Sequence, residues 1–450
     1  MAAYAAALVA TGMLVSRRVR RAGDFFVAGR RLSGPQVFVT LLAANIGAGS
    51  TVGATGLGYA HGLSAWWWSG SAALGCLLLG VLVVPRIHGL AAERGLLTVG
   101  DYLELRYDRS VRALVTGILW PATLLILAGQ IIAMAWAFEV VAGLPKAWGC
   151  ALGGLVLLAY FSRGGLLASV GVNLLELAVL LLGFGLALAF AWTAAGGWDG
   201  LRHAGGPALP PGERLGLFLS LAPSFVVSPG LVQKAFGARE AGAARAAALG
   251  NAVALGAFAF VPALLGMAAH AARPGLANPE LALPVLLGVV LPGWLGAFGL
   301  AALFAAEIST ADAVLFMLST SLAKDLYQTF LEPEADDATL LRVGRRTALV
   351  AGLLGVALAL ALPSVVAALK GFYALMTTAL FAPLVVGLWT RRPGPRHART
   401  AVAGAVAVFL GASWWLSGTP GGAWRPQAMA VGAAFALLGT AWLGPRGGGA

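Results

Sequence analysis

Long apolar runs alternate with short polar segments along almost the whole chain. A helix that crosses a bilayer needs about 20 apolar residues. Runs of this kind predict an all-α polytopic membrane protein with spans near residues 35–59, 66–87, 111–142, 146–162, 168–194, 215–234, 240–272, 293–327, 342–362, 365–390, 399–417 and 426–444. The opening run Ala2–Val15 covers only about 21 Å of a hydrocarbon core of ~30 Å, so we expect 12–13 transmembrane helices.

Composition agrees with a lipid environment. Hydrophobic residues make up 59% of the chain and charged residues 11%, which is far from the composition of a soluble domain. We therefore expect one integral domain over residues 1–450, multi-pass, in the inner or plasma membrane. Cys76 and Cys150 lie in apolar runs and the five histidines have no metal-ligand spacing, so a metalloenzyme is not expected.

The basic residues indicate the orientation of the spans. Alternate loops carry most of the 30 Lys and Arg residues, and such loops face the cytoplasm. With the segment before Gln36 inside, only six basic residues are predicted outside, namely Lys146, Arg202, Arg214, Arg273, Lys370 and Arg425. The net charge of +12 thus reflects topology, and basic residues spread over many loops do not form a nucleic-acid surface.

The spans divide into two halves of opposite orientation. Five spans over residues 35–194 begin inside and five over 215–390 begin outside, a 5+5 inverted repeat typical of secondary transporters. The first helix of each repeat is interrupted, by Asn45 to Ser50 in one half and by Pro223 to Gly230 in the other. Broken helices bind solutes or ions in many transporters. The alternative is that these small residues only permit close helix packing.

A pair of hydroxyls marks the span at 293–327. Ser309, Thr310 and the carbonyl of Ala306 lie on one helical face and could converge on a small cation, since hard cations prefer several oxygen ligands. Each hydroxyl could equally bond to its own backbone one turn earlier, as Ser and Thr often do in membrane helices. The spacing alone leaves both interpretations open.

Several motifs, in their order and spacing, resemble the sodium/solute symporter family over most of the chain. The motifs are the segment from Asp24 to Arg30, the stretch from Ala43 to Ile46, the segment from Tyr160 to Ala168 and the helix from Glu307 to Tyr327. Phe161 departs from this pattern, because a smaller residue is usual there. The resemblance implies a leucine-transporter-type fold that works by alternating access.

The resemblance also implies a sodium site and a solute site. Sodium (Na⁺) would be bound by the backbone carbonyls of Ala43, Ile46 and Ala306 and by the hydroxyls of Ser309 and Thr310. The solute would touch Asn45, Gly47, Gly49, Ser50, Gln130, Phe225, Ser228, Phe372 and Tyr373, although the last two could be ordinary packing residues. The complete sugar-binding or proline-binding residue set of the family is not present, so the resemblance does not identify the substrate of this protein.

Four further polar residues within the spans are candidates for an ion path. Glu307 stands where relatives usually carry an apolar residue, and an acid within the membrane is costly enough to suggest a role. Asp312 follows in the same helix, and Asn173 and Glu176 lie where relatives carry Asp or Gln. These groups could instead bond to neighbouring helices.

We therefore expect a sodium-coupled symporter of a small organic solute, with a monomer sufficient for transport. A proton-coupled transporter of the same fold is the nearest alternative. A helix N-terminus near Ser50 and Thr51 favours an anionic group, so a monocarboxylate or amino acid is preferred, and a sugar or polyol remains an alternative. Neither a channel filter nor an enzyme's catalytic constellation is evident in the sequence.

Overall fold

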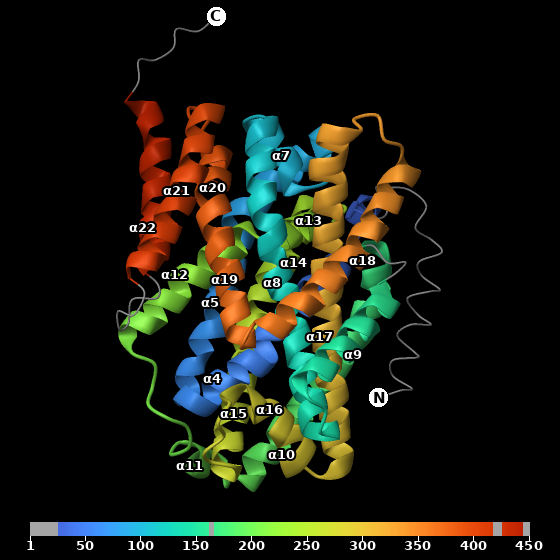
Figure 1. Cartoon of the computed structure of the whole chain (residues 1–450), viewed down its shortest axis with the longest axis vertical. Coiled ribbons are helices and arrows are strands. Elements are labelled where there is room, and N and C mark those ends of the chain that lie inside the picture. Colours follow the sequence, from blue (N-terminus) through green and yellow to red (C-terminus); the bar gives the residue numbers. More distant parts are fainter. Residues whose placement is uncertain (1–25, 162–165, 417–424, 444–450) are drawn as a thin grey trace, which may run out of the picture.

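A computed structural model of the chain describes residues 26–161, 166–416 and 425–443. Within these ranges the chain is almost wholly helical, and long helices run along the molecule and form one bundle (Figure 1). This confirms the all-α prediction. The run Ala2–Val15, residues 24–25 of the first motif and residues 162–165 of the third lie outside the described ranges.

Helices occupy all of the predicted spans. The α-helices are α3 (Gly34–Asn45), α4 (Ala54–His61), α5 (Trp66–Leu78), α6 (Val84–Arg94), α7 (Val99–Arg106), α8 (Arg109–Ala142), α9 (Lys146–Phe161), α10 (Leu166–Ala194), α11 (Gly197–Leu201), α12 (Pro211–Val227), α13 (Pro229–Phe236), α14 (Ala241–Phe258), α15 (Phe260–Ala272), α16 (Ala282–Val285), α17 (Gly293–Thr320), α18 (Asp337–Ala361), α19 (Val365–Met376), α20 (Ala382–Trp389), α21 (Pro395–Trp415) and α22 (Arg425–Gly439).

Short π and 3-10 segments join or extend these helices. The π segments are η2 (Gly49–Gly53), η4 (Leu79–Val83), η6 (Leu286–Val290), η7 (Ser321–Leu331) and η8 (Thr377–Phe381), and the 3-10 segments are η1 (Ala28–Arg30), η3 (Gly62–Ala65), η5 (Pro279–Leu281) and η9 (Thr440–Trp442). In the described part of the chain, eight continuous helical stretches are long and apolar enough to cross a membrane, and the segments Lys146–Leu158 and Pro279–Val290 are shorter apolar helices.

Local sequence sets many helix ends. The side chain of Asp108 accepts a hydrogen bond from the Val111 amide at the start of α8, which satisfies one of the free N–H groups there. At the other end of α8, Gly143 adopts φ 64°, ψ 20°, a left-handed conformation that glycine takes without steric cost. Asp336 and Ser364 cap α18 and α19 in the same way as Asp108.

Two helical segments were not predicted from the apolar pattern. The helix α7 is short and carries charged residues, and its start is fixed by a capping box between Thr98 and Asp101. The other segment, Pro279–Val290, follows a cap by Asn278. Neither lies in a predicted span, because neither is long enough to cross the bilayer.

The first span is broken, as predicted. After α3 the backbone at Ile46 turns to φ −103°, ψ 91°, and helix resumes at Gly49. Gly47 is required at this break, because a Cβ there would overlap the Thr310 hydroxyl and the Gln130 side chain. The chain can therefore pass close to both of these side chains only without a side chain of its own.

The span from Pro211 to Phe236 is broken at Ser228, which has φ −50°, ψ 116° between α12 and α13. Pro229 begins α13 and has no backbone N–H to continue the hydrogen-bond ladder of α12. The proline also disfavours helical conformation at the preceding residue, Ser228. Each half therefore begins with an interrupted helix.

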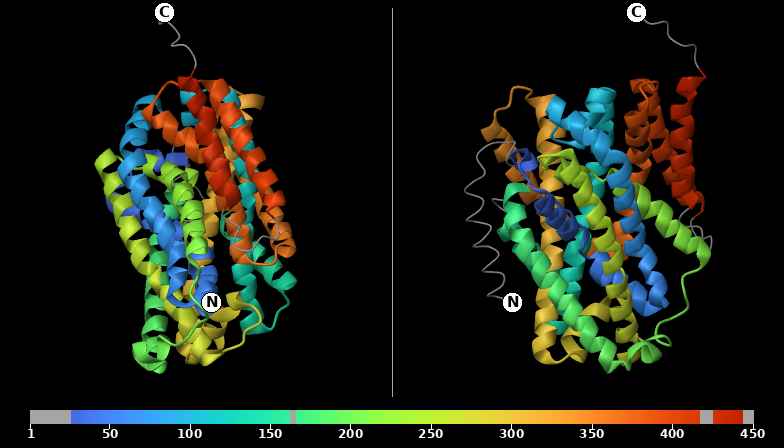
Figure 2. Two further views of the ribbon diagram at one scale, coloured as in Figure 1. Left: turned by 90° about the vertical axis from the view of Figure 1, so that its left-hand side faces the viewer. Right: turned by 180° about the vertical axis from the view of Figure 1, so that it is seen from behind.

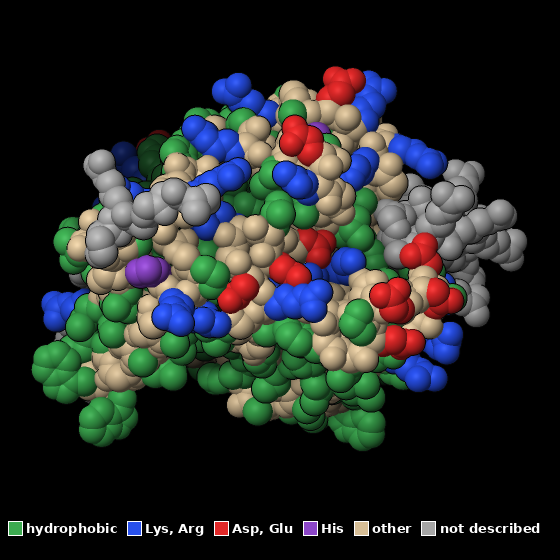
Figure 3. Space-filling model, turned by 90° about the horizontal axis from the view of Figure 1, so that it is seen from above, with side chains coloured by type: hydrophobic (Ala, Val, Ile, Leu, Met, Phe, Trp, Pro, Cys, Tyr) green, Lys and Arg blue, Asp and Glu red, His purple; other side chains and the backbone are tan. Residues whose placement is uncertain are grey.

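One end of the bundle is rich in arginine, and we call it the arginine-rich end. It contains residues 86–112, 324–346 and 387–399, and hydrogen bonds from Arg106 to Gly387 and Thr390 hold two of these segments together. Figure 3 looks onto this end and shows many Lys and Arg side chains. The last two helices, α21 and α22, pack together along one edge of the bundle (Figure 2).

Candidate functional site

A cavity lies between the two broken helices, and we call it the solute cavity. All nine residues predicted to touch the solute line it: Asn45, Gly47, Gly49, Ser50, Gln130, Phe225, Ser228, Phe372 and Tyr373. They come from the breaks in the two halves, from α8 and from α19. The fold thus brings residues from four separate parts of the sequence to one place.

Gln130 fixes the backbone of the first break. Its side chain is fully buried in α8, and its Oε1 accepts a hydrogen bond of 2.8 Å from the Ala48 amide. A backbone amide left without a partner inside a membrane protein would be costly. Gln130 therefore holds the break in position and also lines the solute cavity.

Aromatic side chains cover one side of the solute cavity. Tyr373 lies with its ring centroid 5.4 Å from that of Phe225 and 5.3 Å from that of Phe372. Trp68 packs edge-on against Tyr373, with a centroid distance of 6.3 Å. All four rings are buried, so Phe372 and Tyr373 combine packing with a place in the cavity wall.

Asn45 links the first break to two other helices. Its amide donates a hydrogen bond of 3.2 Å to Asn251 Oδ1 on α14 and lies 3.6 Å from Cys76 Sγ on α5. The carbonyl of Asn45 accepts a hydrogen bond of 2.8 Å from the Ser50 hydroxyl. Asn251 was not identified from the sequence, because the hydrophobic pattern gives no signal for which helix faces Asn45.

Four of the five predicted sodium ligands, Ala43, Ala306, Ser309 and Thr310, lie close together where α17 passes α3. Ser309 Oγ is 3.1 Å from the Ala43 carbonyl oxygen and 3.0 Å from that of Ala306. Thr310 Oγ1 is 3.3 Å from the Ala43 carbonyl oxygen. Only the Ser309–Ala306 contact is a bond within one helix, so the fold favours an arrangement between helices over purely local bonding.

Lys234 is a lining residue that the sequence analysis missed. It is the last residue of the predicted span 215–234, and its side chain is 2% exposed and lines the solute cavity. Its ammonium group donates a hydrogen bond of 3.0 Å to the Thr40 carbonyl of α3. The apolar run ends at Lys234, and a basic residue at that position is typical of the end of a span rather than of a binding site.

The four candidate ion-path residues are all buried. Asn173 and Glu176 lie on α10, which packs against the helix α17 that carries Glu307 and Asp312. Glu307 contacts the broken first helix, where its Oε1 is 2.8 Å from the Thr51 hydroxyl.

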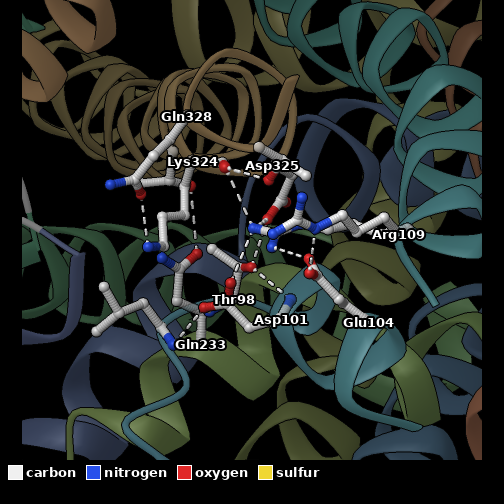
Figure 4. A network of polar contacts seen from close by, with 12 residues as sticks. Thr98, Asp101, Glu104, Arg109, Gln233, Lys324, Asp325 and Gln328 are labelled. Carbon is white, nitrogen blue, oxygen red and sulfur yellow. Dashed lines mark hydrogen bonds and ion pairs between the residues drawn. The ribbon is translucent and has the colours of Figure 1, made fainter. Parts of the chain in front are cut away.

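A network of charged and polar residues joins α7, α8 and η7 at the arginine-rich end (Figure 4). Arg112 contacts Asp325 at 2.6 Å, Asp101 at 2.8 Å and Glu104 at 2.7 Å. The hydroxyl of Thr98 donates a hydrogen bond of 2.6 Å to Asp325. Arg112 and Asp325 are both buried, so this is an interior network.

Glu104 lies at the more exposed edge of this network. Burial alone would raise the pKa of its carboxyl, but hydrogen bonds from Arg112 and Arg109 outweigh that effect and lower the pKa. Glu104 therefore favours its charged form beside these two guanidinium groups.

A second cavity lies between the solute cavity and this network. The two cavities share the lining residues Met317, Phe372 and Met376. At its other end the second cavity is lined by Thr98, Gly100 and Asp325. The two cavities thus follow one another from the broken helices to the Arg112–Asp325 pair.

Comparison with known proteins identifies relatives of the chain. The model of the sodium:solute symporter family matches residues 25–205 and 226–404. The chain is 24% identical to the sodium/glucose cotransporter of Vibrio parahaemolyticus over 91% of this chain and 84% of that protein. It is 26% identical to the sodium/pantothenate symporter of Escherichia coli, over 84% of this chain and 82% of that protein.

A further relative is the uncharacterized symporter YidK of Escherichia coli, 28% identical over 78% of this chain and 65% of that protein. Among solved structures, a Na⁺-coupled sialic acid symporter matches with a TM-score of 0.82 at 18% identity, covering 98% of this chain and 97% of that one. The nucleobase-cation-symport-1 transporter Mhp1 matches with a TM-score of 0.64 at 16% identity, covering 94% and 95%. The fold is that of these membrane transporters, and the chain belongs to the sodium:solute symporter family.

Proposed function

We propose that this protein couples the entry of sodium to the uptake of a small organic solute by alternating access. The proposed unit is a single domain over residues 1–450 with inverted repeats over about 35–194 and 215–390, and a monomer is sufficient. The observation that carries the proposal is the approach of Ser309 and Thr310 on α17 to the Ala43 carbonyl at the break of the first helix.

The sodium site is proposed to consist of the carbonyls of Ala43, Ile46 and Ala306 and the hydroxyls of Ser309 and Thr310. These are neutral oxygens, and Na⁺ as a hard cation is bound well by such ligands. Because the ligands come from a broken helix and from α17, a bound ion would hold the two together. Sodium binding would then favour one arrangement of the bundle over the other, as coupling requires.

The solute is proposed to carry a single carboxylate, as in a monocarboxylate or an amino acid. Lys234 supports this choice, because its ammonium group lines the solute cavity and has three N–H donors, of which one bonds to Thr40. A carboxylate near Lys234 would form charge-assisted hydrogen bonds. The sugar or polyol alternative rests on the neutral groups Asn45, Ser50 and Gln130 in the same cavity.

Alternating access needs a barrier on each side of the solute. The Arg112–Asp325 network is proposed as the barrier at the arginine-rich end, since it stands at the far end of the second cavity. The buried aromatic residues around Tyr373 are proposed to close the opposite side. Release of solute to the cytoplasm would require α7 and η7 to separate.

Uptake into proteoliposomes with and without a sodium gradient tests the proposed coupling. Ser309→Ala and Thr310→Ala each remove one oxygen ligand and are expected to raise the sodium concentration needed for transport about tenfold, which corresponds to ~1.4 kcal/mol. Thr347→Ala, which removes a hydroxyl bonded only within α18, is the matched control. Unchanged sodium dependence in both site variants would reject the site.

Competition between solutes tests the proposed carboxylate. Monocarboxylates and amino acids are expected to compete for sodium-stimulated uptake, and Lys234→Met is expected to weaken competition by these carboxylates more than it weakens competition by neutral sugars. If only neutral sugars compete, the sugar alternative is correct. Uptake driven by a proton gradient without sodium would favour the proton-coupled alternative instead.

A further inference from the structure

A third cavity opens at the arginine-rich end, and we call it the arginine cavity. It has a volume of about 720 Å³ and is lined by residues of α6, of α7 and of the end of α20. A volume of this size is within the range of cavities that bind small ligands, roughly 300–1,000 Å³. The arginine cavity shares no lining residue with the solute cavity or with the second cavity. It is therefore not part of the proposed path of the solute.

Four arginines line the arginine cavity, and no acidic residue does. Arg86 and Arg94 belong to α6, where they follow a spacing of four residues with Leu90 between them and so share one side of the helix. Arg106 comes from α7, and Arg391 follows the end of α20. Several positive charges gathered in one cavity without a counter-charge attract an anion.

Two of these arginines are held in place by the protein. Arg106 donates hydrogen bonds to the carbonyls of Gly387 and Thr390. The guanidinium carbon of Arg86 lies 4.1 Å from the ring centroid of Trp389, a cation–π contact. These contacts join α6 and α7 to the end of α20 and give the cavity a fixed wall.

The other two arginines are available to a ligand. Arg94 and Arg391 are exposed, and neither forms a hydrogen bond or ion pair with the part of the chain that the structure describes. The two acidic residues of α7 are already paired with Arg112 in the interior network. Glu93, the acidic residue of α6, is exposed and does not line the cavity. A guanidinium group has five N–H donors, so two of them can bind several oxygens of one anion.

Tyr102 adds a hydrogen-bond donor that has no acceptor. Its side chain is 1% exposed and lines the arginine cavity, and its hydroxyl has no hydrogen-bond partner among the described residues. Gly387, which also lines the cavity, has no side chain to cover this hydroxyl, since a Cβ there would lie 2.8 Å from it. A buried hydroxyl without a partner is costly. An oxygen of a bound anion would supply the missing acceptor.

The arginine cavity lies where two membrane spans end. Arg86 stands at the end of one predicted span and Trp389 at the end of another, and tryptophan is typical of the membrane interface. The helical stretch that leads to Arg86 exposes the apolar side chains of Leu77, Leu78 and Val81. Figure 3 shows hydrophobic side chains along the edge of the same end. Charged donors at headgroup level thus adjoin a surface suited to acyl chains.

We propose that the arginine cavity binds the headgroup of an anionic phospholipid. Arg94 and Arg391 would form charge-assisted hydrogen bonds with the phosphate, and Tyr102 would donate a further one. The acyl chains would lie on the exposed apolar residues before Arg86. Basic cavities between membrane helices bind acidic headgroups in this way. A free phosphate offers the same oxygens, but it makes no use of the apolar surface.

Lipid binding to the purified full chain in detergent micelles tests the proposal. The probes are dioctanoyl-phosphatidylglycerol and dioctanoyl-phosphatidylcholine, which have the same acyl chains, and glycerol phosphate, which has none. Native mass spectrometry at increasing probe concentration gives an apparent dissociation constant for each. Phosphatidylglycerol is expected to bind at least about tenfold more tightly than either of the other probes.

Variants locate the lipid. Arg94→Gln combined with Arg391→Gln removes the two available guanidinium groups and is expected to weaken phosphatidylglycerol binding at least about tenfold. Arg345→Gln combined with Arg346→Gln is the matched control, because it removes the same charge from two exposed residues of the same end that do not line the cavity. This control is expected to bind the lipid like the wild type.

Two single variants keep the test informative if the double variant does not fold. Arg391→Gln changes a residue beyond the end of α20, and Tyr102→Phe removes only the hydroxyl. Each is expected to weaken phosphatidylglycerol binding severalfold and to leave phosphatidylcholine binding unchanged. Wild-type binding in both single variants would contradict the proposed contacts.

Three results would overturn the proposal. Equal binding of the two lipids would show that the headgroup charge is not recognised. Equal losses in the two double variants would show that the lipid responds only to general surface charge. Binding of glycerol phosphate as tight as that of phosphatidylglycerol would indicate a site for a soluble anion. The measurement uses neither sodium nor solute, so its outcome is independent of the proposed function.

Discussion

Arg112 and Asp325 are 213 residues apart in the sequence, yet Arg112 Nη2 lies 2.6 Å from Asp325 Oδ1 in the interior. The pair joins the start of α8 to η7, the continuation of α17. Asp101 contacts the same guanidinium group at 2.8 Å. Glu104 contacts it at 2.7 Å as well, so a change at Arg112 affects three carboxylates at once.

Arg112→Met is expected to destabilise the protein strongly, because it leaves Asp325 buried without its cation. Breaking a buried pair from one side costs about 3–5 kcal/mol. Arg109→Met is the matched control, since the Arg109 side chain is 66% exposed and its ion pair with Glu104 is expected to contribute less than about 1 kcal/mol. Thermal unfolding in detergent compares the two. Equal losses of thermal stability in the two variants would show that the buried Arg112 network stabilises the protein no more than the exposed Arg109 pair does.

Combining Arg112→Met with Asp325→Leu tests the pairing itself. The double variant no longer contains the unpaired carboxylate of Asp325, so it is expected to lose less stability than the sum of the two single variants. Additive losses would contradict a direct interaction between these residues.

Glu104 predicts a dependence of stability on pH. Its pKa is lowered in the folded protein because, although burial opposes this, hydrogen bonds from Arg112 and Arg109 favour the charged form. The stabilisation is therefore present above the unfolded pKa of about 4.3 and is lost as the pH falls toward the lower folded pKa. Glu104→Gln is expected to lose about 1 kcal/mol or less at pH 7 and to respond less to acid than the wild type. Parallel acid-unfolding curves for the two proteins would contradict this role.

Gly47→Ala is expected to impair the solute cavity. The new Cβ would overlap Thr310 Oγ1 and lie 2.6 Å from Gln130 Oε1, so the break or both side chains must move. Reduced sodium and solute binding is expected, by at least about tenfold for a shift that costs ~1.4 kcal/mol. Gly117→Ala on α8 meets nothing within 4 Å and is expected to bind normally. Normal binding by Gly47→Ala would show that the break is not rigid.

Asn251→Ala removes the hydrogen-bond acceptor of the Asn45 amide on α14. A buried amide without its partner costs about 1–3 kcal/mol, and Asn45 lines the solute cavity. We expect solute affinity to fall by roughly tenfold, as measured by equilibrium binding. Cys76→Ser is the control, because the Cys76 contact with Asn45 is longer, at 3.6 Å, and serine keeps an acceptor. A larger loss of solute affinity in Cys76→Ser than in Asn251→Ala would contradict the conclusion that Asn251 is the more important partner of Asn45.

The sequence alone determined the positions of the spans, the two breaks and the residues around them. These features depend on local chemistry: apolar length sets a span, Pro229 cannot continue the hydrogen-bond ladder of the helix before it, and small residues such as Gly47 mark the first break. Six of the nine residues that the family resemblance implies around the solute come from these breaks, and all nine line one cavity. The sequence also placed Ser309 and Thr310 on one face of their helix, since that follows from helical periodicity.

The tertiary structure alone decided which distant side chains meet. Periodicity gives the face of a residue on its own helix, but not the neighbour across the interface, because that depends on how helices cross and slide against each other. Lys234 therefore stood at the end of the predicted span 215–234 and was not among the expected solute contacts, although it is buried in the cavity wall. The contact between Glu307 and Thr51 joins residues 256 positions apart, and only helix packing could place that acid against the broken helix.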